Sequence, residues 1–69
     1  MPIRIHISTL LGQRKMTQRE LSERTGIRPN TISNMYYETV KRIDVQHIEA
    51  LCKALKCSVG DIIEYVEEE

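Results

Sequence analysis

The sequence is poor in several residue types and has no long hydrophobic segment. Its 69 residues include no tryptophan, no phenylalanine, three tyrosines, three glycines and two prolines. No apolar run approaches the roughly 20 residues that a membrane-spanning helix needs, and the N-terminus lacks the apolar segment of a secretory signal. We therefore expect a single cytoplasmic domain, residues 1–69, with no membrane partner. A chain this short buries a modest core, and oligomerisation is one common remedy.

Patterns typical of enzymes and metal sites are also missing. The sequence shows no Ser-His-Asp arrangement, no glycine-rich phosphate loop and no paired carboxylates. A zinc site built from the cysteines Cys52 and Cys57 with His6 and His47 is the alternative, but the paired spacings of zinc modules are absent. Each cysteine falls where an apolar residue is wanted, so we expect reduced core thiols. The prediction is a protein with no enzymatic activity, no cofactor, no metal and no small-molecule substrate.

Charge is distributed unevenly, although ten basic and ten acidic residues give a formal net charge of zero. Residues 1–42 hold eight basic and three acidic residues, a net charge of +5. Residues 43–69 hold two basic and seven acidic residues, a net charge of −5. The first part can face a polyanion that the second part repels. The alternative is that both parts are simply solvated surface.

Residues 17–31, TQRELSERTGIRPNT, contain the signals that end one helix and begin another. Thr17 and Glu20 fit a capping box, in which each side chain accepts a hydrogen bond from the other residue's backbone amide. Gly26 suits the left-handed C-terminal cap of this helix, and Pro29 suits the first turn of the next helix. The link is short, so the segment predicts a helix-turn-helix over residues 17–36. Ile27, in the link, can fill the angle between the two helices.

Apolar periodicity predicts three more helices. One covers residues 8–14, one begins after Asp44, and a short one begins after Ser58. Residues 37–43 are expected to form a loop. The inward positions of the five helices are Leu10, Leu11, Leu21, Ile32, Met35, Val45, Ile48, Leu51, Cys52, Leu55, Val59, Ile62 and Ile63.

The two ends of the chain differ from the middle. Ile3, Ile5 and Ile7 alternate with polar residues, which is the period of a half-buried strand. Residues 63–67 can extend beyond the last helix. The two ends can therefore pair as short strands, within one chain or between two chains, or they can be helix extensions or frayed ends.

The pattern M-T-Q-x-E-L-x-x-x-T-G-I-x-x-N-T-I-S-x-M, residues 16–35, strongly resembles the helix-turn-helix family of phage repressors and Cro (the XRE type), here a small bacterial member. Residues 48–63 resemble the fourth and fifth helices of the same family. The resemblance covers about residues 8–63. It implies an all-α fold, a compact five-helix domain like that of the lambda repressor. It also implies a transcriptional regulator, most often a repressor, that binds double-stranded operator DNA, commonly as a homodimer.

The resemblance implies that eight residues of this sequence occupy the positions that face DNA in the family. Gln18, at a helix N-terminus, suits a backbone phosphate. Asn30 and Asn34 share one helix face, and asparagine can form a bidentate pair with the edge of adenine. Lys41 and Arg42 suit phosphates. The eight positions are Gln18, Arg28, Pro29, Asn30, Thr31, Asn34, Lys41 and Arg42.

The sequence departs from the family pattern at several positions. Ser22 replaces a frequent alanine, and Arg28 replaces a frequent Ser or Thr cap. Pro29 occupies a base-reading position where it cannot donate a hydrogen bond. The familiar E-x-G ending of the recognition helix is replaced by residues 36–38, YYE. Tyr36 and Tyr37 can stack on sugar or pack under the loop, and packing is favoured for Tyr36.

A second function fits the same scaffold, because a fold does not determine a function. The chain can be a protein-interaction module, such as an antitoxin or the small partner of a larger regulator. The basic N-terminal part and the two asparagines favour DNA. The zero total charge and the short length favour a weak binder that needs a partner or a second copy.

Overall fold

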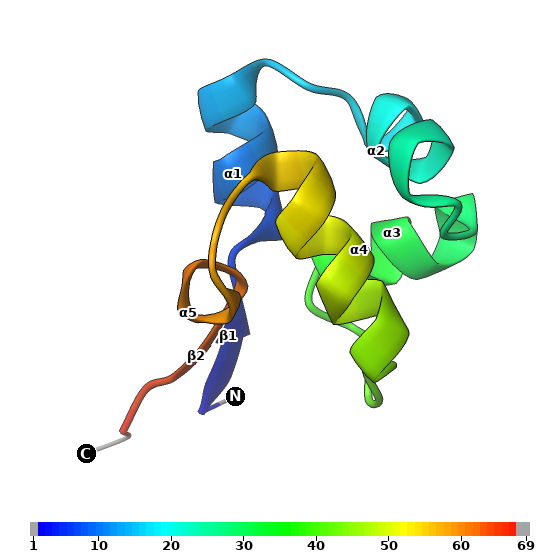
Figure 1. Ribbon diagram of the computed structural model, residues 1–69. Helices are drawn as coiled ribbons and strands as arrows, with labels where there is room; N and C mark the ends of the chain where they lie inside the picture. The colour runs from blue at the N-terminus through cyan, green and yellow to red at the C-terminus, as the bar shows by residue number, and fades with distance from the viewer. Residues whose placement is uncertain (1, 68–69) are drawn as a thin grey trace.

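The fold is mostly helical, with a short two-stranded sheet at the chain ends (Figure 1). The computed structural model describes residues 2–67, so Met1 and the acidic Glu68 and Glu69 lie outside the described part. None of the helices in this part is long and apolar enough to cross a membrane. The elements are β1 (Ile3–Ile5), α1 (Ile7–Arg14), α2 (Gln18–Thr25), α3 (Pro29–Tyr36), α4 (Val45–Leu55), α5 (Val59–Ile62) and β2 (Ile63–Tyr65).

The predicted helix starts are confirmed in their hydrogen bonds. The Glu20 N–H donates to Thr17 Oγ1 at 3.0 Å, and the Thr17 N–H donates to Glu20 Oε1 at 3.3 Å. The Asp44 carboxylate accepts from the Gln46 N–H at 2.8 Å. The Ser58 N–H and hydroxyl both donate to Asp61 Oδ2 at 3.0 Å, which lowers the pKa of the Asp61 carboxyl. Local sequence therefore sets where α2, α4 and α5 begin.

The turn between α2 and α3 is held by side chains as well as by glycine. Gly26 has a φ of 76°, as predicted, and its N–H donates to the Ser22 carbonyl at 2.9 Å. The Ser22 hydroxyl donates to the Ile27 carbonyl, and the Ile27 N–H donates to Thr25 Oγ1 at 3.2 Å. Ile27 itself is buried. Ser22, which stands where an alanine is frequent, thus stabilises the turn that orients α3.

One apolar core joins all five helices and β1. No polar or charged residue among residues 2–67 is buried. Cys52 and Cys57 are half-buried free thiols that pack against the core, and burial raises the pKa of Cys57. The buried residues are Ile5, Ile7, Leu10, Leu11, Leu21, Ile27, Ile32, Met35, Leu51, Leu55 and Ile62.

Several inward positions were predicted wrongly. Val45 is 80% exposed and Val59 is 52% exposed, because each is the first residue of its helix and projects beyond the core. Ile48 is only half-buried. Ile63 packs against the core, as predicted, but as the first residue of β2, and α1 starts at Ile7, one residue earlier than predicted.

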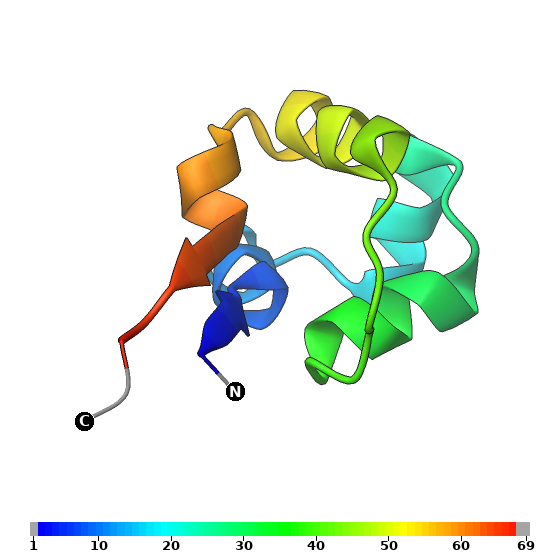
Figure 2. The same cartoon turned by 90° about the horizontal axis from the view of Figure 1, so that it is seen from below.

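The chain ends pair with each other within one chain. β1 and β2 are antiparallel, with Ile3 opposite Tyr65, Arg4 opposite Glu64, and Ile5 opposite Ile63. Figures 1 and 2 both place this sheet on the side of the molecule away from α2. The prediction of terminal strands is confirmed, and the fold is therefore mostly helical rather than purely α.

Replacing Gly26 by valine tests the turn. A β-branched residue is strained at a φ of 76°, and we expect Gly26→Val to lower the free energy of unfolding by more than about 1 kcal/mol. A Cβ added at Gly26, or at Gly12 in α1, would have no neighbouring atom within 4 Å, so neither substitution causes a clash. Gly12→Ala is therefore the matched control, and it should raise stability by about 0.5–1 kcal/mol. Urea unfolding measures both variants, and an unchanged midpoint for Gly26→Val would contradict the account of the turn.

Candidate nucleic-acid interface

Helix α3 turns a polar face outward, because its apolar residues are buried in the core. Ile32 is fully buried and Met35 is 1% exposed. Asn30 and Asn34 lie on the other side of the helix and are exposed, four residues apart on one face. The core thus determines which side chains of α3 a ligand can reach.

The N-terminus of α3 has no side-chain cap. Arg28 occupies the cap position in an extended conformation, with φ −60° and ψ 143°, and no side chain accepts from the first turn. Pro29 has no N–H, and the Ile32 N–H already donates to the Arg28 carbonyl at 3.1 Å. The amides of Asn30 and Thr31 are the donors that a helix start leaves unpaired. Together with the exposed Arg28 side chain, they suit an anion such as phosphate.

Thr39 holds the side chain of Asn34 from the following loop. The Thr39 N–H donates to the Asn34 backbone carbonyl at 2.8 Å, and the Thr39 hydroxyl lies 3.2 Å from Asn34 Oδ1. The carboxamide of Asn34 is therefore oriented by a contact from outside its helix. Sequence reasoning missed Thr39, because the contact depends on how the loop returns along α3.

Glu38 ties the loop after α3 to strand β1. Its carboxylate accepts from Arg4 Nε at 2.8 Å and from Arg4 Nη2 at 3.0 Å. The same carboxylate accepts from the Ile5 N–H at 2.9 Å. These hydrogen bonds, that from Arg4 first, hold the pKa of the Glu38 carboxyl below its usual range, and the pair raises the pKa of Arg4. One carboxylate thus fixes the start of the loop that carries Lys41 and Arg42.

The backbone of Glu38 is left-handed, with a φ of 58°. A residue with a side chain is strained in this conformation, and the family pattern has a glycine here. The sequence departs from the family pattern at residues 36–38, and the side chain of Glu38 there binds Arg4, 34 residues away. Tyr36 packs against the core, as predicted, while Tyr37 is 66% exposed.

The eight predicted residues lie in α2, at the N-cap before α3, in α3 and in the loop that follows. Gln18 is the first residue of α2 and is half-buried, as is Thr31 in α3. The other six are exposed: Arg28, Pro29, Asn30, Asn34, Lys41 and Arg42. Figure 2 shows the loop running from the end of α3 to the start of α4, with α2, in cyan, between these two helices in this view. The predicted residues therefore belong to consecutive parts of the helix-turn-helix, including its turn, and to the loop after it.

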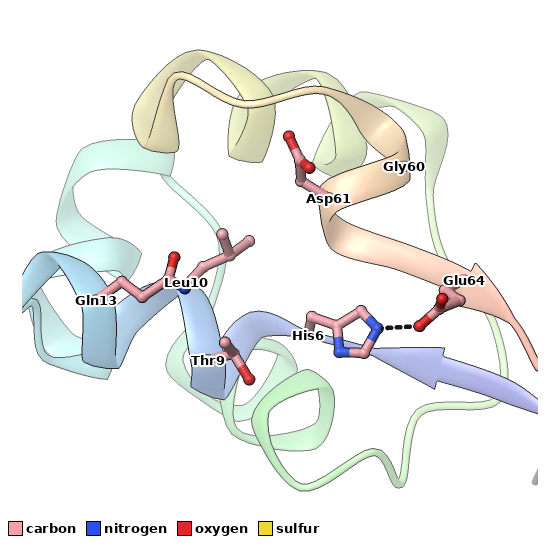
Figure 3. Close-up of a pocket in the computed structure, with 7 residues that line it drawn as sticks. All are labelled: His6, Thr9, Leu10, Gln13, Gly60, Asp61 and Glu64. Atoms are coloured by element: carbon pink, nitrogen blue, oxygen red, sulfur yellow. Dashed lines mark hydrogen bonds and ion pairs between the residues drawn. The ribbon is translucent and has the colours of Figure 1, made fainter.

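A polar cavity of about 300 Å³ lies between α1, α5 and the sheet (Figure 3). His6 Nε2 lies 2.6 Å from Glu64 Oε1 and joins the end of β1 to β2. Asp61 also lines the cavity, but its carboxylate accepts from the Ser58 N–H and caps α5. The two acidic side chains of this cavity, Asp61 and Glu64, thus stabilise the fold through contacts with Ser58 and His6. No group of three His, Cys, Asp or Glu side chains in residues 2–67 could hold a metal ion.

A second cleft, of about 400 Å³, is bordered by cations at the C-terminal ends of α2 and α4. Its lining includes the apolar Ala50 and Ala54 and the cations Arg24, Lys53 and Lys56. Lys53 also pairs with Glu49 at 3.4 Å. This cleft was not predicted, because its cations come from two helices distant in sequence.

Known proteins that resemble this chain in sequence or fold include a transcriptional regulator and a transcription initiation factor. YozG, an uncharacterized HTH-type transcriptional regulator of Bacillus subtilis, is 45% identical over 69 residues, which is all of this chain and 82% of that protein. Transcription initiation factor IIB of Methanoregula boonei is 41% identical over 44 residues, 64% of this chain but 13% of the factor. The crystal structure of a Bacteroides fragilis protein shares the fold, with a TM-score of 0.78 and 21% identity, covering 90% of this chain and 98% of that one.

Residues 6–68 match the Cro/C1-type HTH DNA-binding domain. This match spans most of the chain and contains all eight predicted positions. The chain therefore belongs to the family of Cro/C1-type helix-turn-helix DNA-binding domains.

Proposed function

We propose that this protein is a sequence-specific transcriptional repressor that binds operator DNA as a homodimer, with α3 in the major groove. Residues 1–69 form one domain of the lambda-repressor type in this proposal, and the protein acts in the cytoplasm, where bacterial DNA lies. The observation that carries it is the exposed, uncapped and polar outer face of α3, with the exposed cation Arg28 before the helix and the exposed cations Lys41 and Arg42 in the loop after it.

The side chains divide into base-reading and phosphate-binding groups. Asn34, held by Thr39, presents its carboxamide to a base edge, and Asn30 lies one turn earlier on the same face. Thr31 contacts a phosphate or a thymine methyl group. Pro29 offers only apolar contact, because it has no N–H.

Phosphates are bound at both ends of α3 and at the start of α2. Gln18, at the start of α2, and Arg28, at the start of α3, each approach the backbone from a helix N-terminus. Lys41 and Arg42 neutralise phosphates from the loop that Glu38 fixes. These contacts set the register of the protein on the duplex.

A second candidate is a protein-interaction module, and the cleft at the ends of α2 and α4 favours it. Its lining combines Arg24, Lys53 and Lys56 with two alanines, which suits an acidic segment of a partner protein. In this case the surface of α3 would contribute little to binding.

Selection from a random pool of double-stranded DNA, at two salt concentrations, separates the two functions. The repressor proposal predicts an enriched palindromic motif that persists at the higher salt concentration, since base contacts add to the salt-sensitive phosphate contacts. DNA retention without any motif, lost at the higher salt concentration, would favour the protein-interaction module.

Alanine variants of Asn34 and Lys41 test the assignment of roles. Asn34→Ala should lose about 1–3 kcal/mol of binding free energy on the selected site and almost nothing on scrambled DNA, since only the selected site offers the matching base edge. Lys41→Ala should weaken both DNAs by a similar factor and lower the slope of log affinity against log salt by about one.

Salt titrations on the selected and scrambled sites measure both variants, and each variant controls for the other. If Asn34→Ala weakens both DNAs equally, α3 does not read bases in the proposed way. If neither variant affects DNA binding while a protein partner is lost, the second candidate replaces the first.

Acid titration of stability tests the tie between Glu38 and Arg4. The folded-state pKa of Glu38 lies below its ordinary value of 4.5, so its stabilisation is complete above about pH 4.5 and is lost as the pH falls through the folded value. Glu38→Gln should therefore melt at a lower temperature than the wild type at pH 7, and the difference should shrink in acid.

The matched control is Glu23→Gln, which removes an exposed pair with Arg19 at 3.4 Å and should change the melting temperature little. Thermal melts followed by circular dichroism give the comparison. A difference between Glu38→Gln and the wild type that stays constant from pH 7 into acid would contradict this account of the carboxylate.

A further inference from the structure

The terminal sheet has an open edge on strand β2. The Val66 N–H donates to the Pro2 carbonyl at 2.6 Å, and the His6 N–H donates to the Ile62 carbonyl at 2.8 Å. In an antiparallel pair, hydrogen-bonded and non-hydrogen-bonded positions alternate. The backbone groups of Arg4 and Glu64 therefore point into the pair, and those of Ile3 and Tyr65 point outward.

The two outer edges of the sheet differ. On β1, the outward N–H of Ile5 donates to the Glu38 carboxylate, so the loop after α3 closes this edge. On β2, the Ile63 N–H donates to the Val59 carbonyl and ends α5. In both views, β2 is the outer strand, and no other described element lies beyond it (Figures 1 and 2). The N–H and the carbonyl of Tyr65 thus point away from β1, and the Tyr65 N–H has no backbone partner among residues 2–67.

Apolar side chains are exposed at the same place. Ile3 is 40% exposed, Tyr65 is 66% exposed and Val66 is 42% exposed. Ile3 and Tyr65 are cross-strand partners and therefore lie on the same face of the sheet. An open strand edge beside exposed apolar side chains is a template for pairing with another strand.

We propose that β2 pairs with β2 of a second copy of this chain, antiparallel, with Tyr65 of one copy opposite Tyr65 of the other. The two-stranded sheets then join into one four-stranded sheet across a two-fold axis. The proposal rests on the proposed function, since it supplies the dimer that a palindromic operator requires. It names the surface of that dimer.

In this register, no two carboxylates of residues 63–67 lie directly opposite each other. Glu64 of each copy lies opposite Val66 of the other, and Ile63 lies opposite Glu67. A register centred on Glu64 would instead place two carboxylates directly opposite each other, which is destabilising. The Tyr65-centred pair also places Ile3, Tyr65, Tyr65 and Ile3 in one apolar row across the four strands.

A symmetric pair through β1 is disfavoured by the same reasoning. The edge of β1 is occupied at Ile5 by Glu38, and Arg4 would approach Arg4 of the other copy. A second copy is therefore the partner that fits β2. Because few side chains are covered, the free dimer is weak, at the low end of interface sizes, and a palindromic DNA site strengthens it by mass action.

Sedimentation equilibrium without DNA, from about 10 µM to about 1 mM, tests the surface on the full chain. We expect a monomer–dimer equilibrium in which Tyr65→Lys weakens dimerisation about tenfold or more. The matched control is Val59→Lys, with the same charge change at a 52% exposed position on the neighbouring α5. It should leave the equilibrium unchanged. A wild type that stays monomeric throughout, or a dimer lost only in Val59→Lys, would overturn the proposal.

Amide hydrogen exchange of the wild type tests the same surface independently of whether the variants fold. Protection of the Tyr65 N–H should rise with protein concentration, because this donor is bonded only in the dimer. Protection of the Val66 N–H should stay constant, because that donor is bonded within the chain. Concentration-independent exchange at Tyr65 would contradict the proposed pairing. If the protein selects a DNA motif while remaining monomeric, the dimer surface is wrong and the proposed DNA function stands.

Discussion

The packing of short helices onto one apolar core is the constraint on which the rest of this structure depends. Helices α1, α2 and α3 have eight residues each, which is too short for stable isolated helices in water. Their stability must come from burial of residues such as Ile7, Leu21 and Ile32, all fully buried. The same burial fixes the rotation of α3 about its axis. The outward face with Asn30 and Asn34 is therefore a consequence of which residues face inward.

Contacts between residues distant in sequence then fix the position of the loop that follows α3. Glu38 adopts a left-handed backbone that glycine would adopt more easily, and its contacts with Arg4 and Ile5 offset the strain. The same carboxylate closes the edge of β1 and fixes the start of the loop with Lys41 and Arg42. Through Glu38, the terminal sheet and the proposed DNA-binding loop form one connected unit. This connection gives the dimer surface and the DNA surface a common support.

The parts of the fold that local chemistry determines could be predicted from the sequence. The capping pair Thr17 and Glu20, the cap at Asp44 and the left-handed Gly26 depend on residues a few positions apart. The first positions of α4 and α5 were misassigned, because periodicity cannot tell where a helix leaves the core, as Val45 and Val59 do. The roles of Arg4 and Thr39 could not be predicted, since their contacts depend on how distant segments meet. The intrachain pairing of the ends was left open for the same reason.

The most direct test of the central claim, that the outer face of α3 meets the DNA, is a nuclear magnetic resonance titration of the protein with its selected DNA site. The side-chain amides of Asn30 and Asn34 and the backbone amides of Asn30 and Thr31 should show the largest shifts and contacts with DNA protons. Residues of the cleft at Arg24, Ala50 and Lys53 should change little. Shifts concentrated in that cleft, with α3 unaffected, would contradict the account.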